Sequence, residues 1–196
     1  MLAREVATLP TGEDWSYEFN WGGERVRALK QGGGVRLIAK DGRELANRFP
    51  RVAAAVARLR PEHATIDGEV LLLDGYSAEA IARLAEVSDD LSQARVALLA
   101  YDLIEVEGND LRSLPLLCRR LKLASVVQGT PIVLSPRIYD EPARVLAEAA
   151  RLQLPGIVAK RAGSAYRPNA PTQEWVKVAA GGAVGGRAQT RSSWAA

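Results

Sequence analysis

The chain has 196 residues, with 47% hydrophobic, 25% charged and 6% aromatic side chains. This composition is typical of a globular protein and excludes a disordered, collagen-like or coiled-coil chain. The formal net charge of +3 and the pI near 9.2 permit a nucleic-acid partner without requiring one. One cysteine and one histidine exclude an internal disulfide and a histidine-based metal site. Since no signal peptide opens the chain and no apolar run has the length of a membrane span, we expect a soluble, cytoplasmic protein with no membrane partner.

The first part of the chain has the pattern of β-strands. Residues 1–14 form a mixed lead-in that ends in a turn. Apolar and polar side chains then alternate over residues 15–21, 25–29 and 35–39, and glycine clusters separate these three segments. Alternation with a period of two predicts half-buried strands, and the short glycine turns predict that the strands form an antiparallel meander.

The remaining elements mix helices and strands. In residues 44–59 apolar side chains recur at steps of four and three, the spacing of one helix face, and Pro50 kinks this helix or marks its start. Further helices are expected over residues 78–87, 116–127 and 142–152, and strands over 64–73, 95–103, 157–159 and 174–178. Residues 180–196 are rich in Gly, Ala and Ser and are expected to be a disordered tail. Grouped strands with inserted helices and no strict βαβ alternation predict one α+β domain over residues 15–179.

Two carboxylates stand inside an apolar strand, which is an uncommon place for them. Asp67 and Glu69 are two residues apart, so both point to one face of the strand. Ionised carboxylates in such a run are paired with cations or with a metal ion. A structural interpretation is equally open, in which one carboxylate meets an arginine and the other meets water.

Two lysines follow apolar strand residues in the C-terminal part of the predicted domain. Lys160 follows Ile157 and Val158, and Lys177 lies between two valines. A lysine that faces inward suits a nucleotide phosphate, whereas the common alternative is a lysine that extends along the surface into solvent. Together with the carboxylates and the nearby Tyr101, these lysines predict a pocket for a nucleotide and a divalent metal ion.

The order of these segments resembles the adenylation domain of ATP-dependent DNA ligases, particularly the bacterial repair type, over roughly residues 9–179. Residues 17–25, Tyr-Glu-Phe-Asn-Trp-Gly-Gly-Glu-Arg, stand at the position of the family's Glu-x-Lys-Trp-Asp-Gly-x-Arg motif. Residues 66–70 match its Asp-Gly-Glu strand, and residues 155–160 resemble its Glu-Gly-x-Val-x-Lys motif. Residues 37–43, 101–103 and 175–179 resemble the remaining motifs, the last of which is Trp-x-Lys-x-Lys.

This resemblance implies an ATP-grasp-like nucleotidyltransferase fold, with antiparallel sheets and flanking helices. It implies covalent chemistry in which a lysine attacks the α-phosphate of ATP and the AMP passes to the 5′-phosphate of nicked or broken duplex DNA. It implies ATP and Mg²⁺ as cofactors, with Glu69 on the metal. The nucleotide-binding residues that it implies are Glu18, Arg25, Lys40, Tyr101, Lys160 and Lys177.

The sequence departs from the family pattern at reactive positions. The nucleophile position holds Asn20, and an amide nitrogen with a delocalised lone pair is not a useful nucleophile. Carboxylates of the motifs are replaced by Gly22 and Pro155, and the second lysine of the last motif is Ala179. An arginine expected shortly before Trp175 is Pro171. Loss of a covalent nucleophile alone costs on the order of a million-fold in rate. We therefore expect a domain that does not form the lysyl-AMP intermediate.

Substitute nucleophiles and other functions are the alternatives. The nearest lysines are Lys30, which stands at a strand end and is expected to miss the pocket, and Lys40, which is expected to face phosphate. One alternative is an active ligase or nucleotidyltransferase that uses another nucleophile; another is a non-catalytic module that binds DNA or a repair partner. No OB-fold domain is expected within this sequence, so a separate OB-fold or repair protein is an expected partner.

Overall fold

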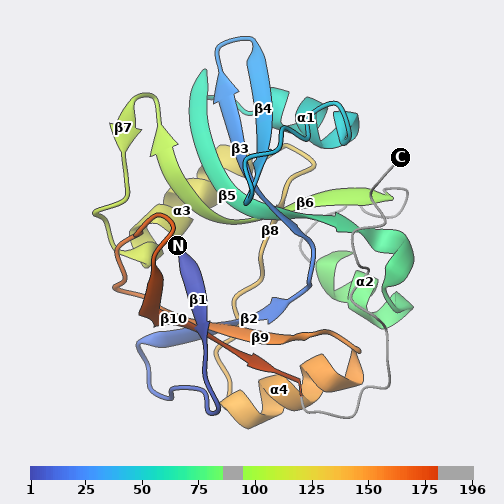
Figure 1. Cartoon of the computed structure of the whole chain (residues 1–196), viewed down its shortest axis with the longest axis vertical. Helices are drawn as coiled ribbons and strands as arrows, with labels where there is room; N and C mark the ends of the chain where they lie inside the picture. The colour runs from blue at the N-terminus through green and yellow to red at the C-terminus, as the bar shows by residue number, and fades with distance from the viewer. Residues whose placement is uncertain (86–94, 181–196) are drawn as a thin grey trace.

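The computed structural model describes residues 1–85 and 95–180, which form two β-sheets with helices on their outer faces (Figure 1). The larger, six-stranded sheet has the order β4-β3-β5-β6-β7, and β8 pairs with β6 beside this path. Its strands are β3 (Glu24–Gln31), β4 (Gly34–Ala39), β5 (His63–Leu72), β6 (Val96–Val106), β7 (Asn109–Asp110) and β8 (Val133–Leu134). Neighbouring strands are antiparallel except β8, which runs parallel to β6. The α+β class and the two sheets agree with the sequence-based expectation.

The smaller, four-stranded sheet has the order β1-β10-β9-β2. Its strands are β1 (Leu2–Glu5), β2 (Trp15–Asn20), β9 (Gly156–Arg161) and β10 (Pro171–Ala179). β1 runs parallel to β10, whereas β9 is antiparallel to both β10 and β2. Residues 2–5 of the expected lead-in are therefore an edge strand of the fold. This strand was not predicted, because four residues are too few to establish a period of two.

The predicted meander of three strands is wrong at its first strand. β3 and β4 form a hairpin, but β2 pairs with β9 in the other sheet. The chain crosses between the sheets at Gly22 and Gly23, where it passes so close to β5 that a β carbon on Gly23 would lie 2.6 Å from the carbonyl oxygen of Val70. Periodicity identifies a strand but not its partner, which depends on the side chains that each face must bury.

The helices are α1 (Pro50–Ala57), α2 (Ala78–Ala85), α3 (Leu116–Val127) and α4 (Pro142–Arg151), with a single 3₁₀ turn at Leu73–Gly75. α1 is shorter than the predicted helix over 44–59, because the chain turns before Pro50, whose fixed φ favours the first turn. α3 has the predicted bounds. Both the end of the predicted helix over 78–87 and residues 181–196 of the predicted tail lie outside the described residues.

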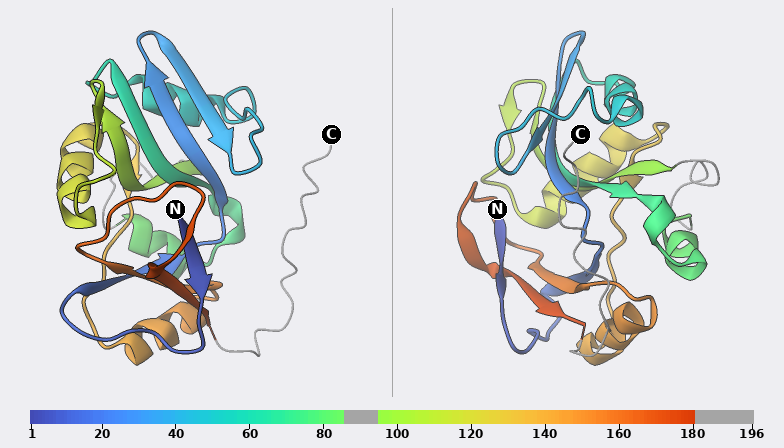
Figure 2. Two further views of the ribbon diagram at one scale, coloured as in Figure 1. Left: turned by 60° about the vertical axis from the view of Figure 1, so that its left-hand side comes forward. Right: turned by 45° about the vertical axis from the view of Figure 1, so that its right-hand side comes forward.

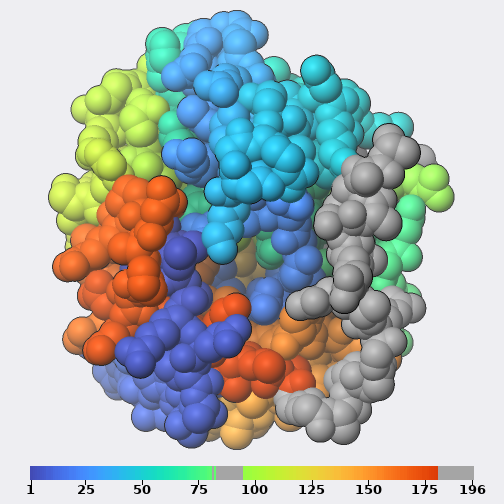
Figure 3. All heavy atoms as spheres, in the orientation of Figure 1, coloured from blue at the N-terminus to red at the C-terminus, as the bar shows by residue number. Residues whose placement is uncertain are grey.

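Helices cover the outer faces of the two sheets, and the inner faces are turned toward each other (Figure 2). α1 and the buried side of α3 pack on the larger sheet through Val52, Val56, Leu123 and Val127. α4 packs on the smaller sheet through Val145 and Ala149, against Tyr17, Phe19 and Ile157. No helix of the described part of the chain is long and apolar enough to cross a membrane. This layering leaves charged side chains of both sheets between them, and the surface dips between the two sheets in the space-filling view (Figure 3).

Candidate nucleotide-binding site

A buried cluster of charged side chains lies on the inner face of the smaller sheet. Oε2 of Glu18 on β2 accepts hydrogen bonds from Nζ of Lys160 on β9 at 2.8 Å and from Oγ of Ser135 at 2.6 Å. Nη1 of Arg120 on α3 lies 3.4 Å from Oε1 of the same carboxylate. Burial opposes ionisation of Glu18, but Lys160 and Arg120 outweigh it and lower its pKa. Burial, only partly offset by Glu18, lowers the pKa of Lys160. Two cations thus share one carboxylate out of contact with water.

Aromatic rings from both sheets surround the Lys160 ammonium group. Its nitrogen lies 4.4 Å from the ring centroid of Tyr101 on β6 and 4.4 Å from that of Trp175 on β10. The guanidinium carbon of Arg25 on β3 lies 5.9 Å from the Tyr101 centroid. Ring faces attract cations through their quadrupole. Tyr101, predicted to stack on adenine, therefore has cations of the protein itself as neighbours, and a base that binds on the ring face under Lys160 must displace that side chain.

Asp67 and Glu69, the two carboxylates of β5, have different partners. Asp67 is fully buried and accepts two hydrogen bonds from Arg25, at 3.1 and 2.6 Å, and one from the Tyr166 hydroxyl at 2.7 Å. Glu69 accepts a hydrogen bond from the Gly23 N–H at 3.0 Å. The structural interpretation offered for this strand is confirmed for Asp67, which meets an arginine. Burial raises the pKa of Glu69 to about 7.

Glu69 is the residue predicted to hold the metal. The described residues contain no group of three or more His, Cys, Asp or Glu side chains that could hold a metal ion. Magnesium is commonly held by one or two carboxylates together with substrate phosphates. The role of Glu69 as one ligand to a magnesium ion that arrives with a nucleotide stays a prediction.

Four positions where the sequence departs from the expected motif lie close together at one end of the smaller sheet. Asn20 pairs with Gly156 across β2 and β9, and Gly156 pairs with Ala179 across β9 and β10. A β carbon on Gly22 would lie 3.1 Å from Cγ of Pro155. The Asn20 side chain accepts a hydrogen bond from the Gly22 N–H at 3.1 Å. The four positions predicted to carry the reaction therefore do lie close together. One of them holds an amide side chain, and the other three hold residues without polar side-chain atoms.

The remaining predicted lysines lie apart from the buried cluster. Lys177 is 39% exposed and pairs with Glu5 on β1 at 2.9 Å. Lys30 is buried and donates to the carbonyl of Leu59 at 2.7 Å, which confirms that it misses the pocket. Lys40 is exposed in the turn after β4. The nucleotide-binding roles of Lys40 and Lys177 stay predictions.

Sequence reasoning missed two arginines of α3. Arg120 bonds Glu18 and the carbonyls of Tyr101 and Ser135, and Arg119, fully buried, donates to both oxygens of Asp102 at 2.8 and 2.7 Å. The signal was present in the sequence. Both arginines share a helix face with Leu116 and Leu123, at the spacing of a core stripe, and an arginine in a core stripe requires a buried acceptor.

The geometry defines a nucleotidyltransferase-type α+β domain, and comparison with known proteins gives its family. The family model for the ATP dependent DNA ligase domain matches residues 1–179. Over 184 residues the chain is 32% identical to the multifunctional non-homologous end joining protein LigD of Pseudomonas aeruginosa, with 90% of this chain and 22% of that protein covered. The chain belongs to the ATP-dependent DNA ligase family, as its adenylation domain.

Solved structures agree with this assignment. The ligase domain of Mycobacterium tuberculosis LigD superimposes with a TM-score of 0.69 and 26% identity, over 91% of this chain and 59% of that one. The mycobacterial DNA ligase D complexed with ATP and MES gives a TM-score of 0.67 and 26% identity, over 90% and 59%. The chain thus spans about a fifth of the LigD relatives and a little over half of these ligase domains.

Proposed function

We propose that this adenylation domain binds ATP and DNA without forming the covalent lysyl-AMP intermediate. One observation carries the proposal. The positions predicted for the reactive groups, Asn20, Gly22, Pro155 and Ala179, converge at one end of the smaller sheet and all lack the required chemistry. Glu18, Arg25, Tyr101 and Lys160, four of the residues predicted to bind the nucleotide, are retained and contact one another or β5 between the two sheets.

The nucleophile is the first missing group. Nucleotidyl transfer to an enzyme needs a neutral amine, and lysine supplies it when its surroundings suppress protonation. Asn20 offers an amide whose oxygen is bonded to the Gly22 N–H. Of the nearby lysines, Lys30 donates to a backbone carbonyl and Lys160 to Glu18. The buried Lys160 amine stands four residues along β9 from Gly156, the strand partner of Asn20.

Carboxylates expected to hold a metal ion and one lysine of the last motif are missing as well. Phosphoryl transfer depends on cations and polar groups aimed at the oxygens of the transferring phosphate. Gly22, Pro155 and Ala179 supply no charge and no side-chain donor. These losses add to the loss of the nucleophile, because a metal ion held by carboxylates and cations on the phosphates stabilise the charge that develops in the transition state.

Retained binding of ATP and DNA is supported by the charged and aromatic side chains between the two sheets. Glu18, Lys160, Arg120 and Tyr101 form a connected cluster, and Arg25 bridges to β5. One structural relative is named as a complex with ATP, and a LigD relative is named as a non-homologous end joining DNA repair protein. ATP, with magnesium as its counter-ion, and nicked or broken duplex DNA are accordingly the proposed ligands.

Two arms of one experiment test the proposal. The chain is incubated with ATP labelled at the α-phosphate, together with magnesium or manganese, and its intact mass is measured. A family ligase domain with lysine at the position of Asn20 serves as the positive control. We expect the control alone to gain label and the mass of one adenylate. A labelled chain overturns the proposal, and peptide mapping would then identify the other nucleophile, the alternative foreseen from the sequence.

The second arm measures binding. ATP with magnesium should raise the melting temperature in proportion to the logarithm of its concentration above Kd. Absence of any rise at millimolar ATP would remove the nucleotide from the proposal. The chain would then be a domain that binds DNA or a repair partner only.

A further inference from the structure

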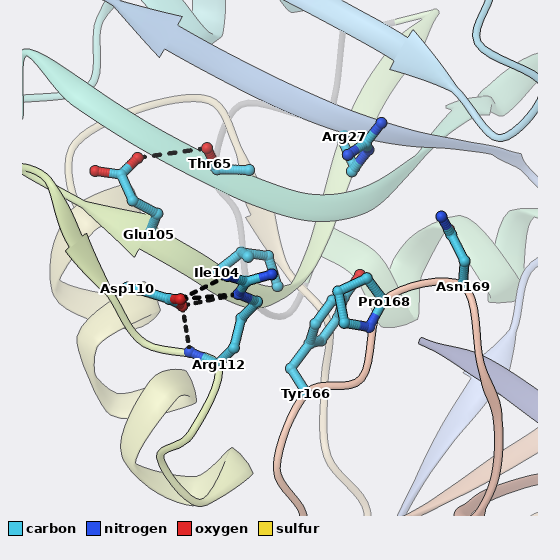
Figure 4. Close-up of a pocket in the computed structure, with 9 residues that line it drawn as sticks. All are labelled: Arg27, Thr65, Ile104, Glu105, Asp110, Arg112, Tyr166, Pro168 and Asn169. Carbon is cyan, nitrogen blue, oxygen red and sulfur yellow. Dashed lines mark hydrogen bonds and ion pairs between the residues drawn. The ribbon is translucent and has the colours of Figure 1, made fainter.

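A hollow of about 310 Å³ lies beside the cleft, at the end of the larger sheet nearest the loop between β9 and β10 (Figure 4). Its walls come from β3, β5, β6, β7, the segment that follows β7 and that loop. The residues that line it are Arg27, Thr65, Ile104, Glu105, Asp110, Arg112, Tyr166, Pro168 and Asn169. Tyr166 lies between the hollow and the buried Asp67, because it lines the hollow and its hydroxyl donates a hydrogen bond to that carboxylate.

Some of the charged side chains that line the hollow have hydrogen-bond or ion-pair partners, and one of them, Arg27, has none among the described residues. Arg112 and Asp110 form a forked ion pair, with Nε and Nη2 at 2.7 to 3.0 Å from the carboxylate oxygens. Glu105 accepts bonds from the Gly108 N–H at 2.6 Å and the Thr65 hydroxyl at 3.4 Å. Its carboxylate lies on the side of the hollow away from Arg27 (Figure 4). Within the described residues the Arg27 guanidinium has no hydrogen bond or ion pair.

The register of β3 and β5 explains why Arg27 stays free. Its direct strand partner is Asp67. Both oxygens of that carboxylate are taken by Arg25 and Tyr166. Arg27 also alternates with Val26 and Ala28, which pack in the core with α1 on the opposite face. Its side chain is therefore held on the inner face, exposed and without a carboxylate.

The loop opposite adds a neutral donor and an apolar wall. Asn169 has a positive φ of 54°, and its amide points toward the β3 side of the hollow (Figure 4). No hydrogen bond of this side chain to another described residue is present. The rings of Tyr166 and Pro168 and the side chain of Ile104 supply apolar surface. A free guanidinium, a free amide and an apolar wall match the phosphate, the sugar oxygens and the carbon atoms of one nucleotide.

We propose that this hollow is a subsite for one phosphodiester-linked nucleotide of a nucleic-acid strand, with its phosphate on Arg27 and its sugar beside Asn169. The inference rests on the DNA-binding part of the proposed function. It places a strand contact outside the cleft, on residues of β3 and the β9–β10 loop. A phosphate group of a free nucleotide or inorganic phosphate has the same chemistry, and the test separates these sources.

The test measures binding of a fluorescent nicked duplex by anisotropy over a range of salt concentrations. Each phosphate contact to B-DNA contributes about −0.9 to the slope of log K against log salt. Arg27→Ala should therefore flatten the slope by about 0.9 and weaken binding roughly tenfold at low salt. Arg51→Ala is the matched control, because Arg51 is exposed on α1 behind the sheet, and it should leave the slope unchanged.

Asn169→Gly tests the side-chain amide of Asn169 without changing the backbone conformation of the loop. Glycine keeps the positive φ, so the loop conformation survives while the donor is lost. Affinity should fall about 2- to 10-fold with no change of slope, because the lost group is neutral. Arg27→Lys should recover the slope and only part of the affinity, because an ammonium group lacks the guanidinium fork.

Three outcomes would overturn the subsite. The first is an equal slope for the Arg27→Ala and Arg51→Ala variants, and the second is absence of duplex binding by the unmodified chain. The third is an Arg27-dependent rise in melting temperature with inorganic phosphate or AMP when duplex binding is insensitive to Arg27. None of these readings depends on labelling by ATP. Failure of the subsite is thus distinguishable from failure of the proposal that no lysyl-AMP forms.

Discussion

Gly22 and Pro155 lie against each other, and a β carbon on Gly22 would come 3.1 Å from Cγ of the proline ring. Both stand where carboxylates were expected from the family motif. Gly22 has a φ of +70°, which residues with side chains rarely adopt, although aspartate tolerates it better than most. A carboxylate cannot be returned to position 22 without relieving its contact with the proline. The two losses are therefore structurally coupled.

The several losses at this end of the smaller sheet predict that Asn20→Lys alone does not restore labelling by ATP. The new amine would face Gly22, Pro155 and Ala179, which supply neither charge nor donors to the phosphates. Adding Gly22→Asp, Pro155→Glu and Ala179→Lys together should give detectable covalent AMP. The readout is the intact mass after incubation with ATP and magnesium. Label on the single Asn20→Lys variant would show that the nucleophile was the only essential loss.

A second prediction concerns the buried ion pair between Glu18 and Lys160. Removing Glu18 leaves two buried cations without their carboxylate, so Glu18→Gln should lower the free energy of unfolding by about 3–5 kcal/mol. Lys160→Met should cost less, because Arg120 still pairs with Glu18. The double variant should lose less than the sum, with a coupling of about 1 kcal/mol or more. Urea denaturation measures all four proteins.

The control for this cycle is the surface pair of Arg144 and Asp140, at 3.1 Å and with the arginine side chain 75% exposed. Arg144→Met should change the free energy of unfolding by about 0.5 kcal/mol or less. If Glu18→Gln were equally mild, the cluster around Glu18 would contribute little to the stability of the fold.

The buried cluster also shows what the sequence could predict and why the rest was inaccessible. Strand and helix positions followed from periodicity, and α3 has the expected bounds because its apolar spacing is regular. The partner of β2 could not be predicted, because period-two alternation is satisfied by either sheet. β1 was missed, because its four residues carry no readable pattern and it is held by pairing with β10, far along the chain.

Site prediction succeeded where a residue type was out of place and failed where only three-dimensional pairing mattered. Asp67 was conspicuous in an apolar strand, and the structure supplies its arginine. Which of several arginines would pair with it was not readable from spacing. Arg120 was overlooked because it belongs to a helix outside every motif, although its place on the core face of α3 marked it as buried.

The raised pKa of Glu69 predicts a pH-dependent stability. Burial raises its pKa to about 7 from the ordinary 4.5, so between these values the folded chain binds more protons than the unfolded chain. Stability contributed by the neutral carboxyl is complete below about pH 4.5 and is lost as the pH rises through 7. Glu69→Gln keeps an acceptor for Gly23 and has no charge. It should match the parent at low pH and exceed it above pH 7 by on the order of 3 kcal/mol.

Urea denaturation at a series of pH values checks this expectation. Glu13→Gln is the control, because Glu13 is exposed in the loop before β2 and its substitution should not alter the pH profile. A Glu69→Gln variant whose stability follows the same pH curve as the parent would place the titration on another group.

Lys177 provides the last prediction, because its ammonium group is held by Glu5 at 2.9 Å. The pair is largely exposed, so its net strength is within about 1 kcal/mol. If Lys177 is to meet a nucleotide phosphate, it must leave Glu5. Glu5→Gln should therefore raise the affinity for ATP by about two- to fivefold, and Lys177→Ala should lower it. Glu13→Gln, which removes the same charge elsewhere, should have no effect in the same calorimetric titration. Equal ATP affinities for the parent and for both the Glu5→Gln and Lys177→Ala variants would exclude Lys177 from the nucleotide site. Its role would then be limited to the ion pair that links β10 to β1.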